Sequence, residues 1–263
     1  MTNYRRSRLQ RVDKVRSSTA ILPIIVLTGL LCGAPQAHPF PENDQGRAVL
    51  TLLAQMESSY AGIEDYTAVL QKQERVDGEL LPEETILLKF KKPLKVYMKW
   101  IKGPHQKREV LYVEGENDNK LIAHEGGVFG FVSLSLYPKS STAMEGNRHP
   151  ITEIGFGHLL DGLHKDIQTA VANDTLEIIR FGEEQFKNRS GIVLEARSVP
   201  RGERKYYASR MVLHVDKELM LPVDTAFYDD KGLLFERYVY TDVRFNVGFT
   251  SKDFSRDNSA YGF

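Results

Sequence analysis

Cysteine is almost absent from this chain: its 263 residues include only Cys32. An internal disulfide framework is therefore excluded, and so is a metal site built from several thiolates. The chain also lacks an excess of charge of one sign, because 35 basic residues balance 35 acidic ones. A protein that binds nucleic acid through its surface potential carries a clear excess of Lys and Arg. The hydrophobic core must therefore hold the fold, and no nucleic acid is expected among its partners.

Charge is missing from one stretch near the start, residues 19–32, which follows a basic stretch made of Arg5, Arg6, Arg8, Arg11, Lys14 and Arg16. A basic segment before a short apolar one is typical of a secretory signal. The apolar part, 21–31, is about half as long as the roughly 20 residues that a membrane-spanning helix needs, and Pro23 interrupts it. Residues 1–37 are predicted to be a signal peptide, and a retained membrane anchor is the weaker alternative.

Cleavage of the signal is expected after Ala37, where small residues follow the apolar run. Cutting after Ala34 would place Pro35 next to the scissile bond, which disfavours that site. The bulky Leu31 before Cys32 argues against attachment of a lipid to the cysteine. Removing six basic residues and one acidic residue leaves 29 and 34, so the mature protein is mildly acidic. We expect it in the periplasm, and not as an integral membrane protein once it is processed.

Helical spacing of apolar residues marks two segments. The first begins at Asn43 and stops at Gly62, with apolar side chains at steps of three and four: Val49, Leu52, Leu53, Met56, Tyr60 and Ile63. The second, 156–173, repeats this spacing in Phe156, Leu159, Leu160, Leu163, Ile167, Ala170 and Val171. Both segments are predicted to be amphipathic helices.

From Tyr66 onward the spacing of apolar residues changes to a period of two, which favours β-strands. Apolar residues alternate with others in 85–91 and again in 94–100, which gives each strand one apolar face. Short polar turns separate further strand candidates at 109–114, 120–124, 176–181, 191–197, 206–215, 222–228 and 233–244. Such a succession predicts an antiparallel meander, which must curl when it is long. Residues 38–263 are thus predicted to form a single mainly β (α+β) domain: a curled antiparallel sheet or unclosed β-barrel, with an N-terminal helix and an internal helix packed on its concave face.

Motifs of catalysis are missing from the sequence, which has no nucleophile elbow and no glycine-rich phosphate loop. His158, Asp161 and His164 follow one another at steps of three, but the two histidines lie about 240° apart around a helix. A solvated helix face explains this trio better than a metal site. His149 before Pro150 is either a turn residue or part of a loop at an opening. We expect no enzyme, no catalytic residues, no metal site and no cofactor.

Two parts of the chain resemble known families. Residues 66–100, YTAVLQKQERVDGELLPEETILLKFKKPLKVYMKW, and 109–115, EVLYVEG, resemble the opening of LolA/LolB-like outer-membrane lipoprotein-sorting carriers. Residues 148–163, RHPITEIGFGHLLDGL, and 253–263, DFSRDNSAYGF, resemble an exported bacterial family, a domain of unknown function. The resemblance implies an unclosed β-barrel with a helical lid over an apolar cavity that receives acyl chains. Long polar insertions around 103–107 and 137–147 depart from the carrier pattern.

Two functions are compatible with these features. The first is a periplasmic binding or carrier protein for an apolar ligand, either an acyl-chain or lipid-like molecule or an acylated protein. Its predicted contacts are the inward residues Ile86, Leu88, Phe90, Val96, Met98, Trp100, Met211, Leu213 and Val215. The alternative is an envelope protein-interaction or stress-sensor module whose barrel is filled by its own side chains and binds no small ligand. Its partner would be an envelope protein, bound by exposed aromatics such as Tyr206, Tyr228 and Tyr238. A cavity of several hundred cubic ångströms favours the first function, and a filled interior favours the second.

Secreted from a bacterial host with its own leader, the protein is expected to begin at His38. Intact-mass measurement and N-terminal sequencing of the periplasmic fraction give the processed end. Ala37→Leu should block cleavage, because signal peptidase requires a small residue before the cut, whereas Ala34→Leu should not. A mature chain that starts at Pro35, or one that is lipid-modified at Cys32, would contradict the predicted site.

Overall fold

The computed structural model describes residues 42–126, 132–199 and 206–263 of the chain. The predicted signal peptide and its cleavage site lie outside these residues. Within the described ranges, no helix combines the length and the apolar character that crossing a bilayer requires.

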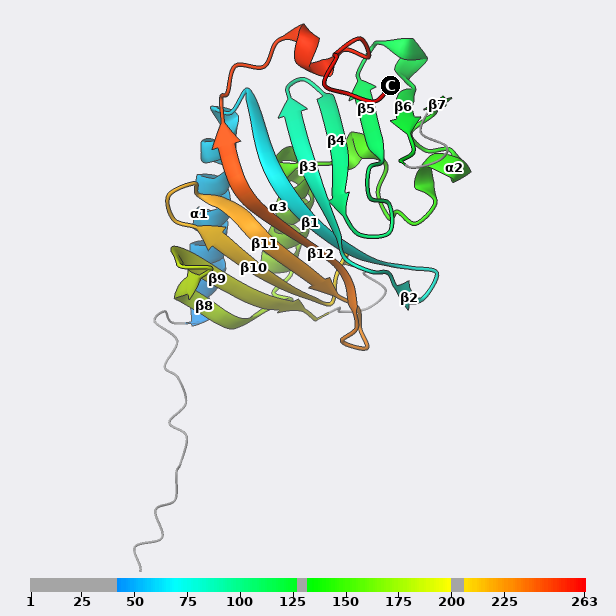
Figure 1. The fold of residues 1–263 in the computed structure, drawn as a ribbon. Helices are drawn as coiled ribbons and strands as arrows, with labels where there is room; N and C mark the ends of the chain where they lie inside the picture. Colours follow the sequence, from blue (N-terminus) through cyan, green and yellow to red (C-terminus); the bar gives the residue numbers. More distant parts are fainter. Residues whose placement is uncertain (1–41, 127–131, 200–205) are drawn as a thin grey trace, which may run out of the picture. The chain divides into compact units, whose positions relative to one another are not determined.

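One antiparallel sheet dominates the fold (Figure 1). Its strand order is β7-β6-β5-β4-β3-β1-β12-β11-β10-β9-β8, and the short β2 pairs with β1 beside this path. The strands are β1 (Asp65–Val76), β2 (Glu79–Leu80), β3 (Glu84–Lys91), β4 (Lys95–Lys102), β5 (Glu109–Val113), β6 (Leu121–His124), β7 (Ser133–Leu136), β8 (Leu176–Phe186), β9 (Arg189–Ser198), β10 (Arg210–Asp216), β11 (Leu221–Tyr228) and β12 (Leu234–Phe245). In the part of the chain that the structure describes, β7 and β8 end the sheet without pairing to each other. The predicted unclosed, mainly β fold is confirmed.

The sheet consists of two meanders joined through β1. Strands β3 to β7 follow one another on one side of β1, and β12 back to β8 lie on the other side. Tyr66 of β1 pairs with Phe90 of β3 and with Phe245 of β12. The first and last strands of the domain are therefore neighbours at its centre.

Alternation of apolar side chains determines which face of each strand is buried. In β3, Ile86 and Leu88 are fully buried, while Leu87 between them is 40% exposed. The inward residues of β4 include Val96, which pairs with Phe90 across the ladder. This period of two matches the pleat of a strand with one face on the core. The inward faces of both strands lie as the sequence predicted, but β4 is buried on its outward face as well, at Tyr97.

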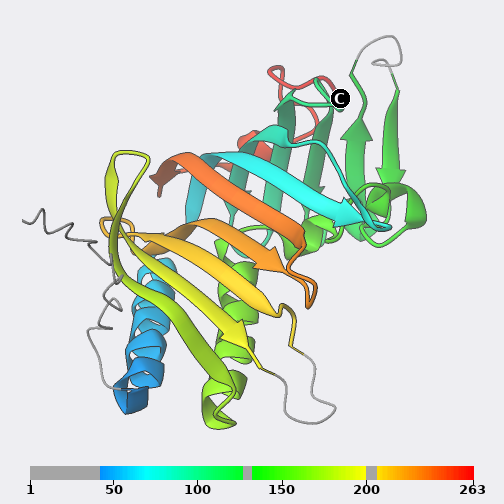
Figure 2. The ribbon, with the colours of Figure 1, turned by 90° about the horizontal axis from the view of Figure 1, so that it is seen from below.

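Both predicted helices are present and pack on the same, concave face of the sheet (Figure 2). They are α1 (Glu42–Ala61) and α3 (Phe156–Ala172). The apolar stripe of α3 is buried through Phe156, Leu160, Leu163, Ile167 and Ala170. In sequence, α3 lies between β7 and β8, so the segment that connects the two ends of the sheet also covers its concave face.

Two glycines let the start of α3 approach its neighbours closely. A Cβ at Gly155 would lie 2.4 Å from the Tyr66 hydroxyl oxygen and 3.3 Å from Phe90, and the backbone there has a φ of +97°. A Cβ at Gly157 would lie 2.7 Å from the Tyr60 hydroxyl oxygen. Only glycine combines this conformation with this space at position 155. The start of α3 is thereby fixed against both β1 and α1.

A second, smaller core lies on the outer face of the sheet. Its buried members are Tyr97, Leu111, Val113 and Phe254. Tyr97 occupies an outward position of β4, yet Tyr261 of the C-terminal segment stacks on its ring at 3.8 Å. The backbone N–H of Gly262 donates to Glu109 Oε2 at 3.0 Å, which holds the segment in place. This packing explains why β4 is buried on both faces.

Several short elements were not predicted. They are β2, β7, the helix α2 (Ser141–Met144) and the 3₁₀ turns at Asn117–Asn119, Ile151–Glu153 and Ser251–Phe254. Each is too short to show a period in the sequence. The strand predicted over 206–215 begins instead at Arg210.

Leu88 and its neighbour Leu87 provide a matched test of the strand faces. Leu88→Ala should lower the free energy of unfolding by about 2–5 kcal/mol, because it leaves a cavity in the core. Leu87→Ala, on the opposite face, should lower it by less than about 1 kcal/mol. Urea denaturation of the mature protein measures both values. Equal losses in the two variants would invalidate the assignment of faces in β3.

Candidate functional site

A cavity of about 770 Å³ lies between the concave face of the sheet and α3. Apolar side chains make up much of its wall: Leu70, Met98, Trp100, Val110, Leu121, Leu159, Leu163, Ile167, Leu176, Met211, Phe227 and Tyr240. They come from strands of both meanders and from α3. The cavity is therefore formed by the curl of the sheet together with the helix that covers it.

The predicted contact residues divide into two groups. Met98, Trp100 and Met211 line the cavity. The other six are buried in the main core and are not among the lining residues: Ile86, Leu88, Phe90, Val96, Leu213 and Val215. Phe90, for example, is covered by Tyr66, whose ring stacks on it at 4.9 Å. Contact between ligand and any of the nine residues stays a prediction.

Trp100 lies in the cavity wall with 5% of its surface exposed. Its indole Nε1 has no hydrogen-bond partner among the described residues. The guanidinium of Arg108 lies 5.7 Å from the centre of its ring. A buried indole N–H normally finds an acceptor, so Nε1 of Trp100 is an exception among the buried polar atoms of the described residues.

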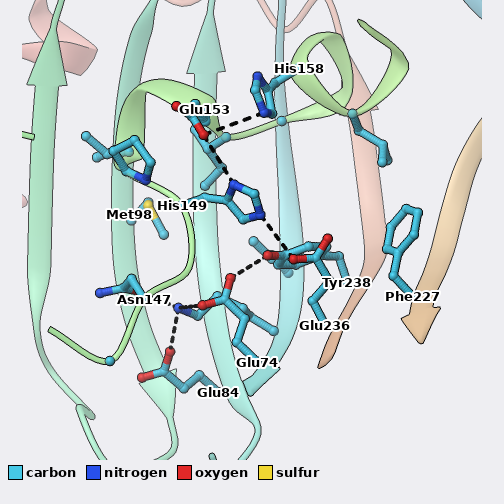
Figure 3. Close-up of a pocket in the computed structure, with 18 of the residues that line it drawn as sticks. Glu74, Glu84, Met98, Asn147, His149, Glu153, His158, Phe227, Glu236 and Tyr238 are labelled. Carbon is cyan, nitrogen blue, oxygen red and sulfur yellow. Dashed lines mark hydrogen bonds and ion pairs between the residues drawn. The ribbon is translucent and has the colours of Figure 1, made fainter. Parts of the chain in front are cut away.

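A group of polar side chains joined by hydrogen bonds and ion pairs crosses the apolar part of the wall (Figure 3). We call it the polar band; its members are Lys72, Glu74, Glu84, Asn147, His149, Glu153, His158, Tyr207, Glu236 and Tyr238. Four of them are at least nine-tenths buried: Lys72, Glu74, Glu84 and Glu236. Burying charged groups is unfavourable unless they are paired, and the contacts within the band provide that pairing.

Lys72 is the centre of one half of the band. Its Nζ lies 3.3 Å from Glu74 Oε2 and 3.4 Å from Glu84 Oε2, and it donates to Asn147 Oδ1 at 2.5 Å. Glu74 also accepts a hydrogen bond from the hydroxyl of Tyr238. Burial, followed by the negative charges of Glu236 and Glu74, raises the pKa of Tyr238 well above its usual value, so this hydroxyl stays a donor.

His149 is the centre of the other half. Its Nε2 lies 3.0 Å from Glu236 Oε2 and 2.9 Å from the Tyr207 hydroxyl, and its Nδ1 lies 3.2 Å from Glu153 Oε2. Burial by itself lowers the pKa of His149, but the bonds and charges of Glu236 and Glu153 outweigh it and raise the pKa above its ordinary value. Arg148 connects the two halves, because its Nε lies 3.2 Å from Glu236 Oε2 and its backbone N–H donates to Glu74.

Three basic side chains surround the carboxylate of Glu153. Besides His149, the Nε2 of His158 lies 3.8 Å from its Oε2, and Nζ of Lys139 lies 3.4 Å from its Oε1. Burial would raise the pKa of this carboxyl, but His149, His158 and Lys139 together hold it below its ordinary value. His164, the third position of the spaced trio considered in the sequence, faces another element: its Nδ1 lies 2.5 Å from Glu57 Oε1 of α1.

The polar band was not predicted from the sequence, although one signal for it exists. In β1 the inward positions Ala68, Leu70, Lys72 and Glu74 are all buried. The alternate positions that are apolar in the first half of the strand are therefore occupied by charged residues in its second half. The inward residue Glu236 of β12 continues its strand's phase in the same way. A charged residue on the apolar phase of a strand marks either a solvated strand end or a buried polar site, and the sequence does not distinguish these alternatives.

Three solved structures illustrate what the chain is similar to. One is a putative outer membrane lipoprotein-sorting protein domain from Vibrio parahaemolyticus, at 14% identity over 80% of this chain and 97% of that chain, with a TM-score of 0.39. Another is the lipoprotein LppX from Mycobacterium tuberculosis, at 10% identity over 78% and 98%, with a TM-score of 0.44. The third is the MucA/MucB complex from Pseudomonas aeruginosa, at 13% identity over 78% and 59%, with a TM-score of 0.39. Identities this low do not identify a ligand or partner.

No curated protein sequence is significantly similar to the chain. A family model does match it: the model describes a protein of unknown function, DUF1571, and covers residues 63–263. The match includes all twelve strands of the sheet, α3 and both sequence segments that resembled an exported family of unknown function. The chain therefore belongs to the DUF1571 family.

Proposed function

We propose that this protein binds an apolar ligand with an acyl chain inside the cavity, as a carrier or binding protein of the bacterial cell envelope. The cavity itself supports the proposal. Its volume of about 770 Å³ falls within the roughly 300–1,000 Å³ of pockets that bind small molecules. Residues 38–263 would act as a single carrier-like domain, released into the periplasm by cleavage of the predicted signal.

The two kinds of wall suit the two parts of such a ligand. Met98, Trp100 and Met211 would contact the acyl chain, and each buried methylene contributes about 0.8 kcal/mol. The polar band would contact the head group, because it presents both donors and carboxylate acceptors inside the cavity. In this proposal the band positions a ligand, and no covalent step is assigned to it.

The alternative function, a protein-interaction or stress-sensor module with a filled barrel, has less support. A cavity of this size is the feature that a filled interior would lack. The three tyrosines predicted to form an exposed aromatic surface for this function are not exposed. Tyr238 lies in the cavity wall, and Tyr206 and Tyr228 are half-buried rather than exposed. An acylated envelope protein remains compatible with the cavity as the source of an acyl chain.

Trp100 should report ligand binding, because it is the only tryptophan and lies in the cavity wall. The mature protein, freed of lipid, is expected to emit at a blue-shifted wavelength that changes further when a long-chain fatty acid is added. Trp100→Phe should remain folded, since most of the apolar area is retained. Emission typical of solvent-exposed indole, or no change at saturating fatty acid, would count against the proposal. Native mass spectrometry of the unwashed protein tests independently for copurified acyl chains.

Gly162 offers a way to fill the cavity without disturbing the fold. It lies on α3 in the cavity wall, and a Cβ there would meet no described heavy atom within 4 Å. Gly162→Phe should weaken fatty-acid binding at least tenfold, because the ring occupies ligand volume. Gly162→Ala is the matched control and should bind normally while stabilising α3 by about 0.5–1 kcal/mol. Titration of Trp100 fluorescence compares the variants, and unchanged affinity in Gly162→Phe would place the ligand elsewhere.

A further inference from the structure

We propose that His149, Glu153 and His158 form a binding site for a divalent transition-metal ion in the wall of the cavity. One ligand atom from each residue lies within 4.8 Å of the other two. The Oε2 atom of Glu153 lies 3.2 Å from His149 Nδ1 and 3.8 Å from His158 Nε2. Two imidazole nitrogens thus converge on one carboxylate oxygen (Figure 3).

These separations suit a small ion with nitrogen and oxygen ligands. A tetrahedral Zn²⁺ with ligands at about 2.1 Å places neighbouring ligand atoms about 3.4 Å apart. The two distances to Glu153 are already close to that value. The remaining pair, the two imidazole nitrogens, must approach by at most about 1.4 Å. The side chain of His158 is 47% exposed and that of Glu153 is 28% exposed, so both have room to move.

The surroundings of His149 orient it as a metal ligand. A histidine that binds a metal usually donates its other ring N–H to a carboxylate, which fixes the tautomer and the ring. Here Nδ1 faces Glu153, and Nε2 lies 3.0 Å from Glu236, which is 3% exposed. Arg148 and Tyr207 hold Glu236 in turn, at 3.2 Å and 2.6 Å.

The local sequence explains how the three proposed metal ligands come together within the ten residues 149–158. Pro150 follows His149 and keeps it out of the helical region. The 3₁₀ turn Ile151–Glu153 then brings Glu153 beside His149, and Gly155 reverses the chain into α3, whose first turn carries His158. Two imidazoles and one carboxylate suit Zn²⁺ or Fe²⁺ better than Ca²⁺ or Mg²⁺, and they leave coordination positions open toward the cavity.

Titration of the mature protein with Zn²⁺ by calorimetry tests this site, and the test does not depend on lipid binding. The wild-type protein is expected to bind a single Zn²⁺ per chain. His158→Ala should weaken Zn²⁺ binding more than about 100-fold. Loss of a residue that only supports a ligand weakens metal binding by about 10–100-fold, so a larger loss indicates a direct ligand. His164→Ala is the matched control, because His164 lies on the same helix, is 43% exposed and also faces a glutamate. Its affinity should equal that of the wild type.

A local readout separates metal binding from a change in folding. Zn²⁺ should shift the ring-proton NMR signals of His149 and His158 and leave those of His164 in place. Tyr207→Phe, which removes one support of the His149–Glu236 pair, should weaken Zn²⁺ binding about 10–100-fold with the fold intact. The proposal is overturned if the wild-type protein shows no saturable Zn²⁺ binding, or if His158→Ala binds as tightly as His164→Ala.

Discussion

The close contact between the start of α3 and the central strand is the constraint on which the rest of the site depends. Gly155 brings the chain so near to Tyr66 and Phe90 that no side chain fits between them. The segment just before Gly155 contains His149 and Glu153. The helix after it, α3, contributes Leu159, Leu163 and Ile167 to the apolar part of the cavity wall. A single anchoring point therefore positions polar and apolar walls together. Displacement of this segment would disturb both at once.

The regular parts of the fold could be predicted because they depend on local periodicity. Alternation in 85–91 and 94–100, and helical spacing in 156–173, gave the correct element types and the correct buried faces. The distinction between cavity wall and filled core could not be predicted in this way. Leu88 and Met98 are paired across β3 and β4, yet only Met98 lines the cavity. That difference depends on where the helices lie, which is a tertiary property.

The polar band could not be predicted for a related reason. Its members come from β1, β3, β12, α3 and the segments before α3 and β10, and their pairings span up to 164 positions, as between Glu74 and Tyr238. No pattern in a short window reports such contacts. Energetically, the band costs more to bury than apolar residues of the same size would. The ion pairs and hydrogen bonds among its members offset that cost. Polar groups in the cavity wall contribute more to discrimination between ligands than to the affinity for any one of them.

The pairing of β1 with β12 also affects when the domain can form. A chain is synthesised from its N-terminus, so β1 exists long before β12, whose first residue, Leu234, follows Val76 at the end of β1 by 158 positions (234 − 76). Until β12 arrives, β1 lacks one neighbour and the two meanders remain unconnected. Long-range pairing of this kind slows folding and leaves apolar surface uncovered meanwhile. The central pair of strands therefore forms only once β12 is available.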